Sequence, residues 1–560
     1  FILLFKICHK YLMIKKISLM IKSKWFYYVS MISLSILVFT YILNITHTYT
    51  FVKHNNEILT KKKSDLFIER NSNAFFYFVQ VTDLHINTHV KTKGFCHFKE
   101  CVEEINSINP EFVIISGDIV DSMNEKYDGI VSKQDFSQYL DLVSGINVPV
   151  YDIRGNHDVF GLNFDENMEY LNKFMIRKER NYFFEFEKSD NKFFFVFIDG
   201  TPKFTSKRFL NFFGYFDDKE FEEEVTNKIR NNNYDHVILT THYPSNTITT
   251  TSQSFFNPSV YLCGHLHNLI FFNEMYKIHE NGCTEAELSD LKNNKTYRIL
   301  TFDNGIFNFS DVKVGKEPKI AILTPKDKKL KTKIEPNLTS KYLRFLVFNH
   351  QEVKAFFNDE KLELEKENNL FTAILPSNIG KIKIIASNSY GNSFKEIDID
   401  SSNHSTYSSF PLNINFLIIS IFFLFSYFFV LVFLTLKKKN LECIIRCLFY
   451  FLLPCALGKF TKNTWSILYN FYVYPNHYFF DTVLYFTTIL FLQEIPYMLY
   501  LLGYFSVLPY LIVCIFHSKI MLYFHFGIVF SIFDLFSLPV FYKYFKSKIF
   551  KKSVITTNVT

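Results

Sequence analysis

The sequence predicts three kinds of structure along one chain: an α/β layered domain, an immunoglobulin-like all-β domain and an all-α transmembrane bundle. Strand-length apolar runs alternate with helix-like stretches across residues 70–312, and closely spaced alternating runs follow across 317–401. Long uncharged apolar stretches flank these two regions, at 25–44 and within 413–542. A chain of 560 residues also exceeds what one compact core usually holds, so at least two folded units are expected.

The N-terminal apolar stretch, residues 25–44, matches the roughly 20 residues that a helix needs to cross a bilayer. It is longer than the apolar region of a cleaved signal peptide, so we expect an uncleaved anchor. Lysines are frequent in residues 1–24, and flanking positive charge marks the cytosolic side of a membrane. The sequence therefore predicts a basic cytosolic N-terminus, with residues 45–415 in a lumen or outside the cell.

Between residues 70 and 312, the strand-length runs read as strands buried on both faces with helices between them, as at 98–107 and 217–230. The runs are 75–81, 112–116, 150–154, 193–198, 237–240 and 260–263. From residue 319 the runs become short and alternating, with turn signals at Asn358-Asp359 and Tyr390-Gly391-Asn392. This second pattern predicts a small immunoglobulin-like β-sandwich over 317–401.

The C-terminal region, residues 413–542, predicts a polytopic membrane domain of about five helices, and the lysine-rich tail 543–560 predicts a cytosolic C-terminus. With both termini in the cytosol the number of crossings is even, so we expect six in total, with four as the alternative. The chain is therefore expected to be an integral protein of an endomembrane or the plasma membrane. Asn-x-Ser/Thr acceptors in the non-cytosolic segment predict a glycoprotein, although an Asn-rich chain also makes such acceptors by chance: Asn294, Asn308, Asn337 and Asn403.

Charge and cysteine usage narrow the class of protein. The formal net charge of +7 is modest, and the lysines that create it sit beside apolar runs, so no nucleic-acid partner is expected. The nine cysteines form no CxxC pair, which argues against a sulfur-ligated zinc site.

Five short polar motifs each follow one of the predicted strands of the α/β domain. Because open α/β sheets bind ligands outside the carboxyl ends of their strands, we expect all five to meet at one rim. The motifs are Asp83-Leu-His85, Gly117-Asp118-Ile-Val-Asp121, Gly155-Asn156-His157-Asp158, Thr241-His242 and Gly264-His265-Leu-His267. The glycines Gly117, Gly155 and Gly264 would let the backbone turn sharply beside a ligand. Oxygen and imidazole ligands without thiolate suit Mn, Fe or Zn, and the sequence leaves the identity of the metal open.

Taken together and in this order, the motifs resemble those of the calcineurin-like metallophosphoesterases, over roughly residues 75–309. By that resemblance, the domain is a metallophosphoesterase head, with a β-sandwich core flanked by helices. The resemblance implies two divalent ions: Asp83, His85 and His267 would hold one, Asn156, His242 and His265 the other, and Asp118 would bridge both. A bridging anion makes physical sense because two adjacent cations repel each other strongly.

The resemblance also implies a general acid. His157 would donate a proton to the leaving alkoxide, and Asp121 resembles the carboxylate that orients this histidine. A solvated turn is the alternative for Asp121, and a structural role is expected for Asp158. Arg154 could clamp a phosphate oxygen as a substrate-binding residue, or it could face a helix and pair with an acid.

The overall layout, with an anchor, a phosphoesterase head, an immunoglobulin-like sandwich and a polytopic C-terminal region, resembles the transmembrane protein 62 family. We therefore expect a membrane-anchored, lumen- or outside-facing phosphoric ester hydrolase, either mono- or diesterase, that uses metal-activated hydroxide. Its expected partners are the lipid bilayer and a phosphoester substrate, with a lipid- or glycolipid-linked phosphodiester as the first candidate and nucleotides as the second. The alternative is a non-catalytic membrane receptor or transport component whose head binds metal or phosphate.

Overall fold

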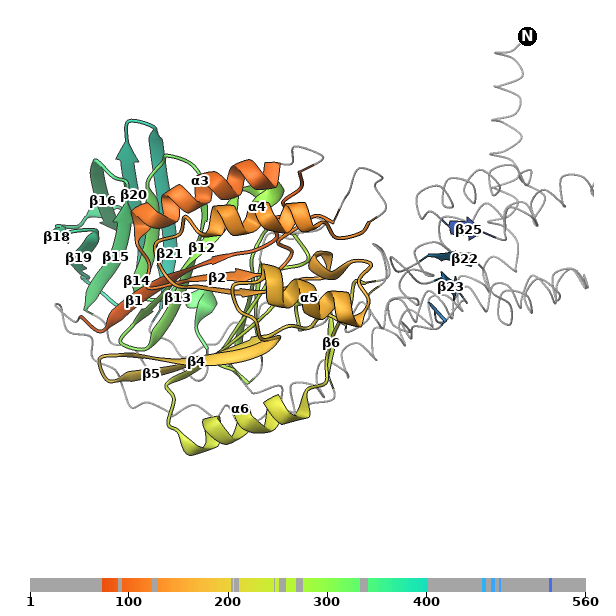
Figure 1. Cartoon of the computed structure of the whole chain (residues 1–560). Helices are drawn as coiled ribbons and strands as arrows, with labels where there is room; N and C mark the ends of the chain where they lie inside the picture. Colours follow the sequence, from red (N-terminus) through yellow and green to blue (C-terminus); the bar gives the residue numbers. More distant parts are fainter. Residues whose placement is uncertain are drawn as a thin grey trace, which may run out of the picture. The chain divides into compact units, whose positions relative to one another are not determined.

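The structure is a computed structural model (Figure 1). It describes residues 73–400, except for gaps at 89–92, 123–128, 203–204, 206–210, 246, 251–257, 268–274, 280 and 333–340, together with 456–459, 465–468, 473–474 and 523–525. The chain divides into two compact units, one of residues 49–414 with 460–464, the other of residues 1–48, 415–459 and 465–560. The predicted N-terminal anchor 25–44, its basic flank 1–24 and the tail 543–560 lie outside the described residues.

The head, residues 73–313, contains a five-stranded sheet in the order β13-β12-β1-β2-β3. The motif-bearing strands β1, β2 and β3 run parallel, and the hairpin of β12 and β13 adds to β1 in antiparallel register. The strands are β1 (Phe75–Val81), β2 (Val113–Ser116), β3 (Val150–Ile153), β12 (Thr296–Asp303) and β13 (Ile306–Lys313).

A second sheet of six strands has the order β10-β11-β9-β7-β5-β4. Strands β5, β7, β9 and β11 run parallel to one another, and an antiparallel strand closes each edge. The strands are β4 (Asn181–Lys188), β5 (Asn191–Ile198), β7 (His236–Thr241), β9 (Val260–Cys263), β10 (Tyr276–Ile278) and β11 (Thr284–Glu287). A small parallel pair, β6 (Gly214–Phe216) with β8 (Ile248–Thr250), stands apart from both sheets.

The two sheets pack face to face through a core rich in phenylalanine. Phe78 on β1 meets Phe195 on β5 edge to face, with 5.5 Å between ring centroids. Phe193 of the second sheet contacts Phe76 of the first edge to face and Phe302 in a tilted arrangement, each at 4.8 Å between ring centroids. Each fully buried side chain of this kind contributes about 1.5 to 3 kcal/mol, so this aromatic layer supplies much of the stability of the head.

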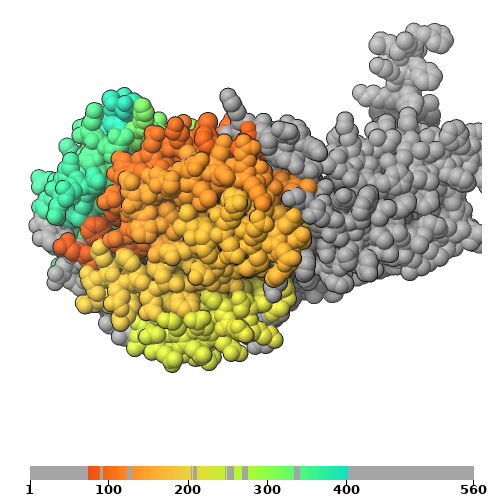
Figure 2. Space-filling model, viewed as in Figure 1, coloured from red at the N-terminus to blue at the C-terminus, as the bar shows by residue number. Residues whose placement is uncertain are grey.

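Helices cover the outer faces of both sheets. Their apolar stripes pack on the strands, and three of them begin at a side-chain cap; for α5 this is a capping box between Asn163 and Glu166. The helices are α3 (Lys93–Ile108), α4 (Lys133–Val143) and α5 (Phe164–Phe174) on the first sheet and α6 (Lys219–Asn231) on the second. In the space-filling view α3, α4 and α5 form one orange face beside the green strands that follow the head (Figure 2). The predicted α/β layered fold, a β-sandwich core flanked by helices, is confirmed.

The second domain of this unit, residues 319–399, consists of two four-stranded sheets in the orders β14-β15-β19-β18 and β17-β16-β20-β21. Alternating apolar side chains of both sheets form its core. The strands are β14 (Lys319–Thr324), β15 (Tyr342–Phe348), β16 (Glu352–Phe357), β17 (Glu360–Lys361), β18 (Glu365–Glu367), β19 (Leu370–Ile374), β20 (Gly380–Asn388) and β21 (Gly391–Ile399). The domain packs directly on the head, since Arg344 pairs with Asp303 and Leu346 and Phe348 join the apolar core beneath α3.

The all-α transmembrane bundle predicted for 413–542 is not found in the part of the chain that the structure describes, and no described helix is long and apolar enough to span a membrane. The described segments there are short strands, β22 (Ala456–Lys459), β23 (Trp465–Leu468), β24 (Val473–Tyr474) and β25 (Tyr523–His525), which form one antiparallel sheet. All four strands lie within residues 413–542, the region predicted to be helical. Hydropathy alone could not separate the two, because runs rich in Phe, Tyr and Ile suit strands as well as helices.

One of the predicted glycosylation acceptors is buried. Asn308 lies on β13 at 3% exposure and donates a hydrogen bond to the carbonyl of Leu323, so a glycan at this position would require the head and the second domain to separate. Asn294 lies at the end of the short helix α7 (Leu291–Asn294) and donates to Asp290. Asn337 and Asn403 lie outside the described residues.

Candidate metal centre

The five motif loops meet at the carboxyl ends of β1, β2, β3, β7 and β9, as the sequence predicts. Their backbones are strained at the positions where a ligand would stand, because a positive φ is uncommon for residues other than glycine. Five candidates have φ between 48° and 82°: Asp83, His85, Asp118, His265 and His267. The buried sheets on either side hold these turns in place, and strain of this kind is concentrated at functional sites.

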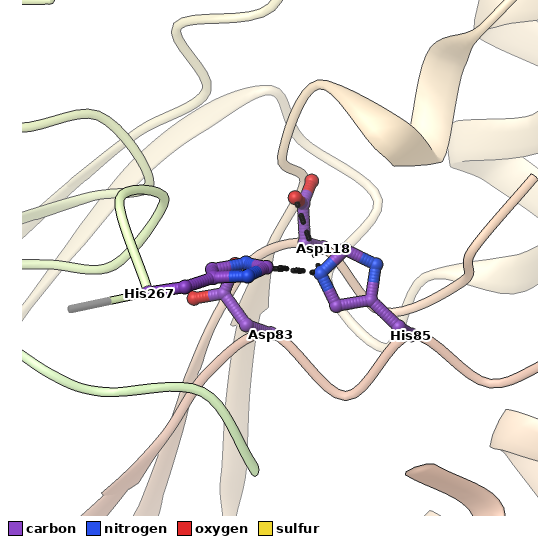
Figure 3. A group of neighbouring side chains, drawn as sticks. All are labelled: Asp83, His85, Asp118 and His267. Carbon is purple, nitrogen blue, oxygen red and sulfur yellow. Dashed lines mark hydrogen bonds and ion pairs between the residues drawn. The ribbon is translucent and has the colours of Figure 1, made fainter. Parts of the chain in front are cut away.

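The first group of side chains comes from the loops after β1, β2 and β9. His267 Nε2 lies 2.5 Å from Asp83 Oδ1 and 3.1 Å from His85 Nε2. His85 Nε2 lies 3.7 Å from both Asp83 Oδ1 and Asp118 Oδ2. Figure 3 shows these four side chains pointing toward one another, with Asp83 and His85 on one loop and Asp118 and His267 on two others. The four can hold one metal ion.

The second group comes from the loops after β2, β3, β7 and β9. His242 Nε2 lies 3.4 Å from Asp118 Oδ1 and 3.2 Å from His265 Nδ1. Asn156 Oδ1 lies 3.3 Å from His242 Nε2 and 3.1 Å from His265 Nδ1. The side chain of His242 is fixed from behind, because its Nδ1 lies 2.9 Å from the carbonyl oxygen of Ser116.

Both groups suit a divalent cation. Ligand atoms about 2.0–2.2 Å from one ion lie roughly 3 to 3.5 Å from one another. The distances in the second group, 3.1 to 3.4 Å, have this spacing, and those in the first group, 2.5 to 3.7 Å, lie on either side of it. Asp118 belongs to both groups, with Oδ2 toward His85 and Oδ1 toward His242. The structure thus brings together all seven predicted ligands, and a carboxylate with one oxygen toward each group can bridge two ions.

Charge interactions inside the site are strong. Burial by itself would lower the pKa of His85, but the carboxylates of Asp121, Asp83 and Asp118 raise it to about 10. Burial also opposes the charged form of His242, whose pKa is nevertheless raised to about 9 by Asp118 and Asp83. Burial, assisted by the charge on His242, lowers the pKa of His265 to about 3. Without a metal ion, the raised pKa values favour the protonated forms of His85 and His242, and a cation would have to displace these protons.

His157 lies at the edge of the first group and is partly exposed. Its Nε2 is 3.9 Å from Asp118 Oδ2, and its Nδ1 is 3.2 Å from the backbone oxygen of Asp121. The carboxylate of Asp121 lies closer to the predicted ligand His85 than to His157, at 3.2 Å against 3.7 Å from the Nδ1 atoms. Asp121 is thus buried among charged partners, in contrast to the solvated turn that was the alternative.

Asp158 has the structural role expected from the sequence. Its carboxylate is buried and accepts hydrogen bonds from the backbone N–H groups of Gly155 and Val120, at 2.7 Å and 2.9 Å. These bonds tie the loop after β3 to the loop after β2. Burial and the nearby charge of Asp118 raise the pKa of Asp158 to about 7.

Arg154 is not placed to bind substrate, which corrects one of the two interpretations of this residue. Its guanidinium is 1% exposed and donates through Nε and Nη2 to Asp199 Oδ2, at 2.8 Å and 2.6 Å. Its Nη1 donates to the backbone and side-chain oxygens of Asn167 on α5. The pairing with an acid against a helix is therefore what the structure has, and Asp199, 45 residues away in the chain, provides that acid.

The motif glycines are needed for two different reasons. Gly117 has φ of +95°, which only glycine adopts readily. A Cβ at Gly155 would lie 2.2 Å from Asp118 Oδ1, and a Cβ at Gly264 would lie 2.5 Å from Asp83 Oδ2. At these two positions the missing side chain makes room for ligands from neighbouring loops.

Three residues near the site were missed by the sequence reasoning: Lys292, Glu285 and Glu287. Lys292 Nζ lies 3.1 Å from Asp121 Oδ1. Both glutamates are buried on β11, a four-residue strand that was not predicted. The available signal was only a pair of acids two positions apart, Glu285-Ala-Glu287.

The comparison with family models bears on the fold of the head and on its candidate metal centre. Residues 76–269 match the family model of the calcineurin-like phosphoesterases, and the predicted resemblance to this superfamily is confirmed.

Two curated proteins give a more particular likeness. The chain is 29% identical over 268 residues to "Transmembrane protein 62" of Mus musculus, which confirms the predicted resemblance to that family. It is 24% identical over 318 residues to an Arabidopsis thaliana protein whose name places it among the metallophosphoesterases. In each case the match covers 46% of this chain and 42% of the relative, so the chain spans less than half of the length of these relatives.

Solved structures with similar folds include a dimetal phosphatase from Danio rerio, at 12% identity and a TM-score of 0.30, covering 43% of this chain and 99% of that one. A 5'-nucleotidase precursor from Thermus thermophilus matches at 10% identity and a TM-score of 0.29, covering 43% of this chain and 54% of that one. At these TM-scores the two likenesses carry no argument about this chain.

Proposed function

We propose that this chain hydrolyses a phosphoric ester with the help of two divalent metal ions held at the rim of the head. The observation that carries the proposal is the position of Asp118, whose two carboxylate oxygens face His85 on one side and His242 on the other. A protein that bound a single ion would not need a carboxylate shared between two complete sets of ligands.

The residues of the chain divide the work of the reaction. Asp83, His85 and His267 would hold one ion, and Asn156, His242 and His265 the other, each through atoms that already converge. Two such ions would activate a water molecule and neutralise charge on the phosphoryl oxygens, and Mn, Fe and Zn all suit these ligands.

His157 would supply the proton that the leaving alkoxide needs. It is partly exposed at the edge of the site, and its Nδ1 lies against the backbone oxygen of Asp121, which leaves Nε2 directed toward Asp118. An imidazole held this way can keep its orientation while it transfers a proton through Nε2. The presence of this group favours turnover over passive binding of phosphate.

The setting of the reaction is part of the proposal. The apolar stretches 25–44 and 413–542 and the likeness to a relative named as a transmembrane protein support a membrane-anchored enzyme with the head in a lumen or outside the cell and both termini in the cytosol. A head beside a bilayer would meet lipid- or glycolipid-linked phosphoesters, which we propose as the first substrate class, ahead of nucleotides.

We also propose that the domain of residues 319–399 is immunoglobulin-like. Counted along the chain, its strands form the sheets 1-2-6-5 and 4-3-7-8. This is the order of the A-B-E-D and C-F-G sheets of an immunoglobulin domain with one additional edge strand.

The test is turnover by the purified full chain in detergent, supplied with Mn, on an aryl phosphomonoester and an aryl phosphodiester. Wild type should hydrolyse at least one of them. Asp118→Asn should lose both metal and activity, and His157→Ala should keep the metal but lose about 10²- to 10⁴-fold in turnover. Lys133→Ala, which breaks an exposed ion pair with Glu169 on the helical face, is the matched control and should leave activity unchanged.

Metal binding without turnover on any phosphoester would favour the alternative of a receptor or transport component. Topology is tested separately by mapping glycans at Asn337, because only a non-cytosolic head can carry one.

A further inference from the structure

Strand β11 and the turn after it contact four of the five ligand loops. Leu291 N and Lys292 N donate to the carbonyls of Thr82 and Asp83 in the loop after β1, and the Lys292 side chain reaches Asp121 in the loop after β2. On β11 itself, the buried Glu285 contacts the loop after β7, and the buried Glu287 contacts the loop after β9. All of this segment lies beyond residue 269, where the match to the family model ends.

Glu287 stands at the carboxyl end of β11, 1% exposed, next to the loop that carries His265 and His267. Its Oε1 accepts a hydrogen bond from Leu266 N, the residue between the two histidines, at 3.1 Å. Leu266 N also donates to the carbonyl of Gly264, two residues back, at 3.2 Å. Because both histidines have positive φ, this loop needs external bonds to keep its shape.

Asp83 provides the second such bond. Its Oδ2 accepts a hydrogen bond from His265 N at 3.1 Å. The buried carboxyl groups of Asp83 and Glu287 thus bind two successive backbone N–H groups of this loop, those of His265 and Leu266. Asp83 is itself a predicted ligand, whereas Glu287 has no oxygen among the converging ligand atoms. Glu287 is therefore not placed as a ligand, and its hydrogen bond to the ligand loop is made with the backbone of Leu266.

Glu285 makes the equivalent contact with the loop after β7. Its two oxygens accept from Ser245 N at 2.8 Å and Ser245 Oγ at 2.6 Å, three residues beyond His242. His279 Nε2 lies 2.6 Å from Glu285 Oε2 and holds that carboxylate in place. The same strand thus supports the loops of three predicted histidine ligands.

We propose that Glu287 is a positioning residue that sets the metal affinity of the site by fixing the backbone between His265 and His267. The inference rests on the metal centre of the proposed function and deepens it. Outer partners that orient metal ligands typically change affinity by about 10- to 100-fold when they are removed, and a bond to the backbone of a two-ligand loop should fall in that range.

The experiment compares Glu287→Leu, which removes the acceptor, with Glu287→Gln, which keeps an oxygen at the same place. Metal affinity is measured on the full chain in detergent by competition with a chelator, and the absorption spectrum of the Co²⁺-loaded protein reports the ligand geometry. Glu287→Leu should weaken metal binding about 10-fold or more and alter the Co²⁺ spectrum, and Glu287→Gln should restore both to within about threefold of wild type.

Glu104 supplies the matched control. It is a partly buried glutamate on α3 that also accepts a backbone hydrogen bond, from Gly315, and its other partners, Tyr297 and Lys319, are not predicted ligands. Glu104→Leu should lower the melting temperature of the chelator-treated chain without changing metal affinity. The melting temperature of chelator-treated Glu287→Leu is compared with that of wild type in the same experiment. It shows whether a lower metal affinity of this variant comes from a destabilised fold.

The outcomes separate the two proposals. If wild type binds no divalent metal, the proposed function fails, whatever the variants do. If wild type binds two ions and Glu287→Leu binds them with unchanged affinity and spectrum, the positioning role of Glu287 is wrong. A loss of affinity that Glu287→Gln does not rescue, or that Glu104→Leu reproduces, would also overturn it.

Discussion

The Asp121 carboxylate lies against the His85 ring, with Asp121 Oδ1 3.2 Å from His85 Nδ1. Because Nδ1 faces this carboxylate, Nε2 of His85 points toward Asp83, Asp118 and His267. Lys292 Nζ approaches the same Asp121 oxygen at 3.1 Å and keeps it in place. Asp121 therefore supports a predicted metal ligand as well as the histidine that it was expected to orient.

Asp121→Ala should weaken metal binding about 10- to 100-fold as well as turnover, because His85 loses the partner that fixes its ring. His157→Ala should lower turnover while leaving metal affinity within about twofold of wild type. Chelator competition on the two variants, measured beside their turnover, checks the difference. Unchanged metal affinity in Asp121→Ala would limit Asp121 to a role with His157.

The five motif loops could be predicted from the sequence because each follows a strand-length apolar run, and the ends of parallel strands meet at one edge. Glu287 and Lys292 could not be predicted in the same way. They belong to a four-residue strand and a one-turn helix, and two acids in a short strand suggest exposure unless the backbone groups that they accept from are known. The partner of Arg154, Asp199, could not be predicted either, because spacing along the chain does not show which distant acid pairs with an arginine at the end of a strand.

Metal affinity should rise with pH, because His85 and His242 have pKa values raised to about 10 and about 9 and must lose their protons to bind a cation. For each proton released, the apparent affinity should increase about tenfold per pH unit from about pH 7 to about pH 9. An ordinary histidine, with a pKa near 6.5, would give a plateau over this range. Chelator competition at several pH values distinguishes the two cases.

The same shifts fix the sign of the stability change in the metal-stripped chain. A histidine whose folded pKa is raised contributes stability that is fully present below its unfolded pKa of about 6.5 and is lost as pH rises through the folded value. The melting temperature of the chelator-treated chain should therefore fall as pH rises through about 9 and about 10. Metal-loaded protein should not show this fall, and a parallel fall in both samples would assign it to other groups.

Arg154→Met should destabilise the fold instead of weakening substrate binding. Removing this arginine leaves Asp199 buried, and breaking a buried ion pair costs about 3 to 5 kcal/mol. The lower end is expected because Arg180 still lies 3.6 Å from Asp199 Oδ1. The melting temperature should fall by several degrees, whereas Lys133→Met, which breaks an exposed pair, should cost less than about 1 kcal/mol. A raised KM at an unchanged melting temperature would instead support the interpretation of Arg154 as a substrate-binding residue.

Gly155→Ala should damage the metal centre through a single methyl group. The new Cβ would lie 2.2 Å from Asp118 Oδ1 and 2.8 Å from His242 Cδ2, so the bridging carboxylate must move. Overpacking of this kind costs about 1 to 3 kcal/mol, and a displaced bridge should lower metal affinity about 10-fold or more. At Gly145, after helix α4, the nearest atoms to a Cβ are 3.3 Å and 3.6 Å away, so Gly145→Ala should change neither property appreciably. Metal titration and melting curves of the two alanine variants test whether Gly155 is needed to leave room for the ligands. Equal metal affinity in both variants would show that the site tolerates the methyl group at position 155.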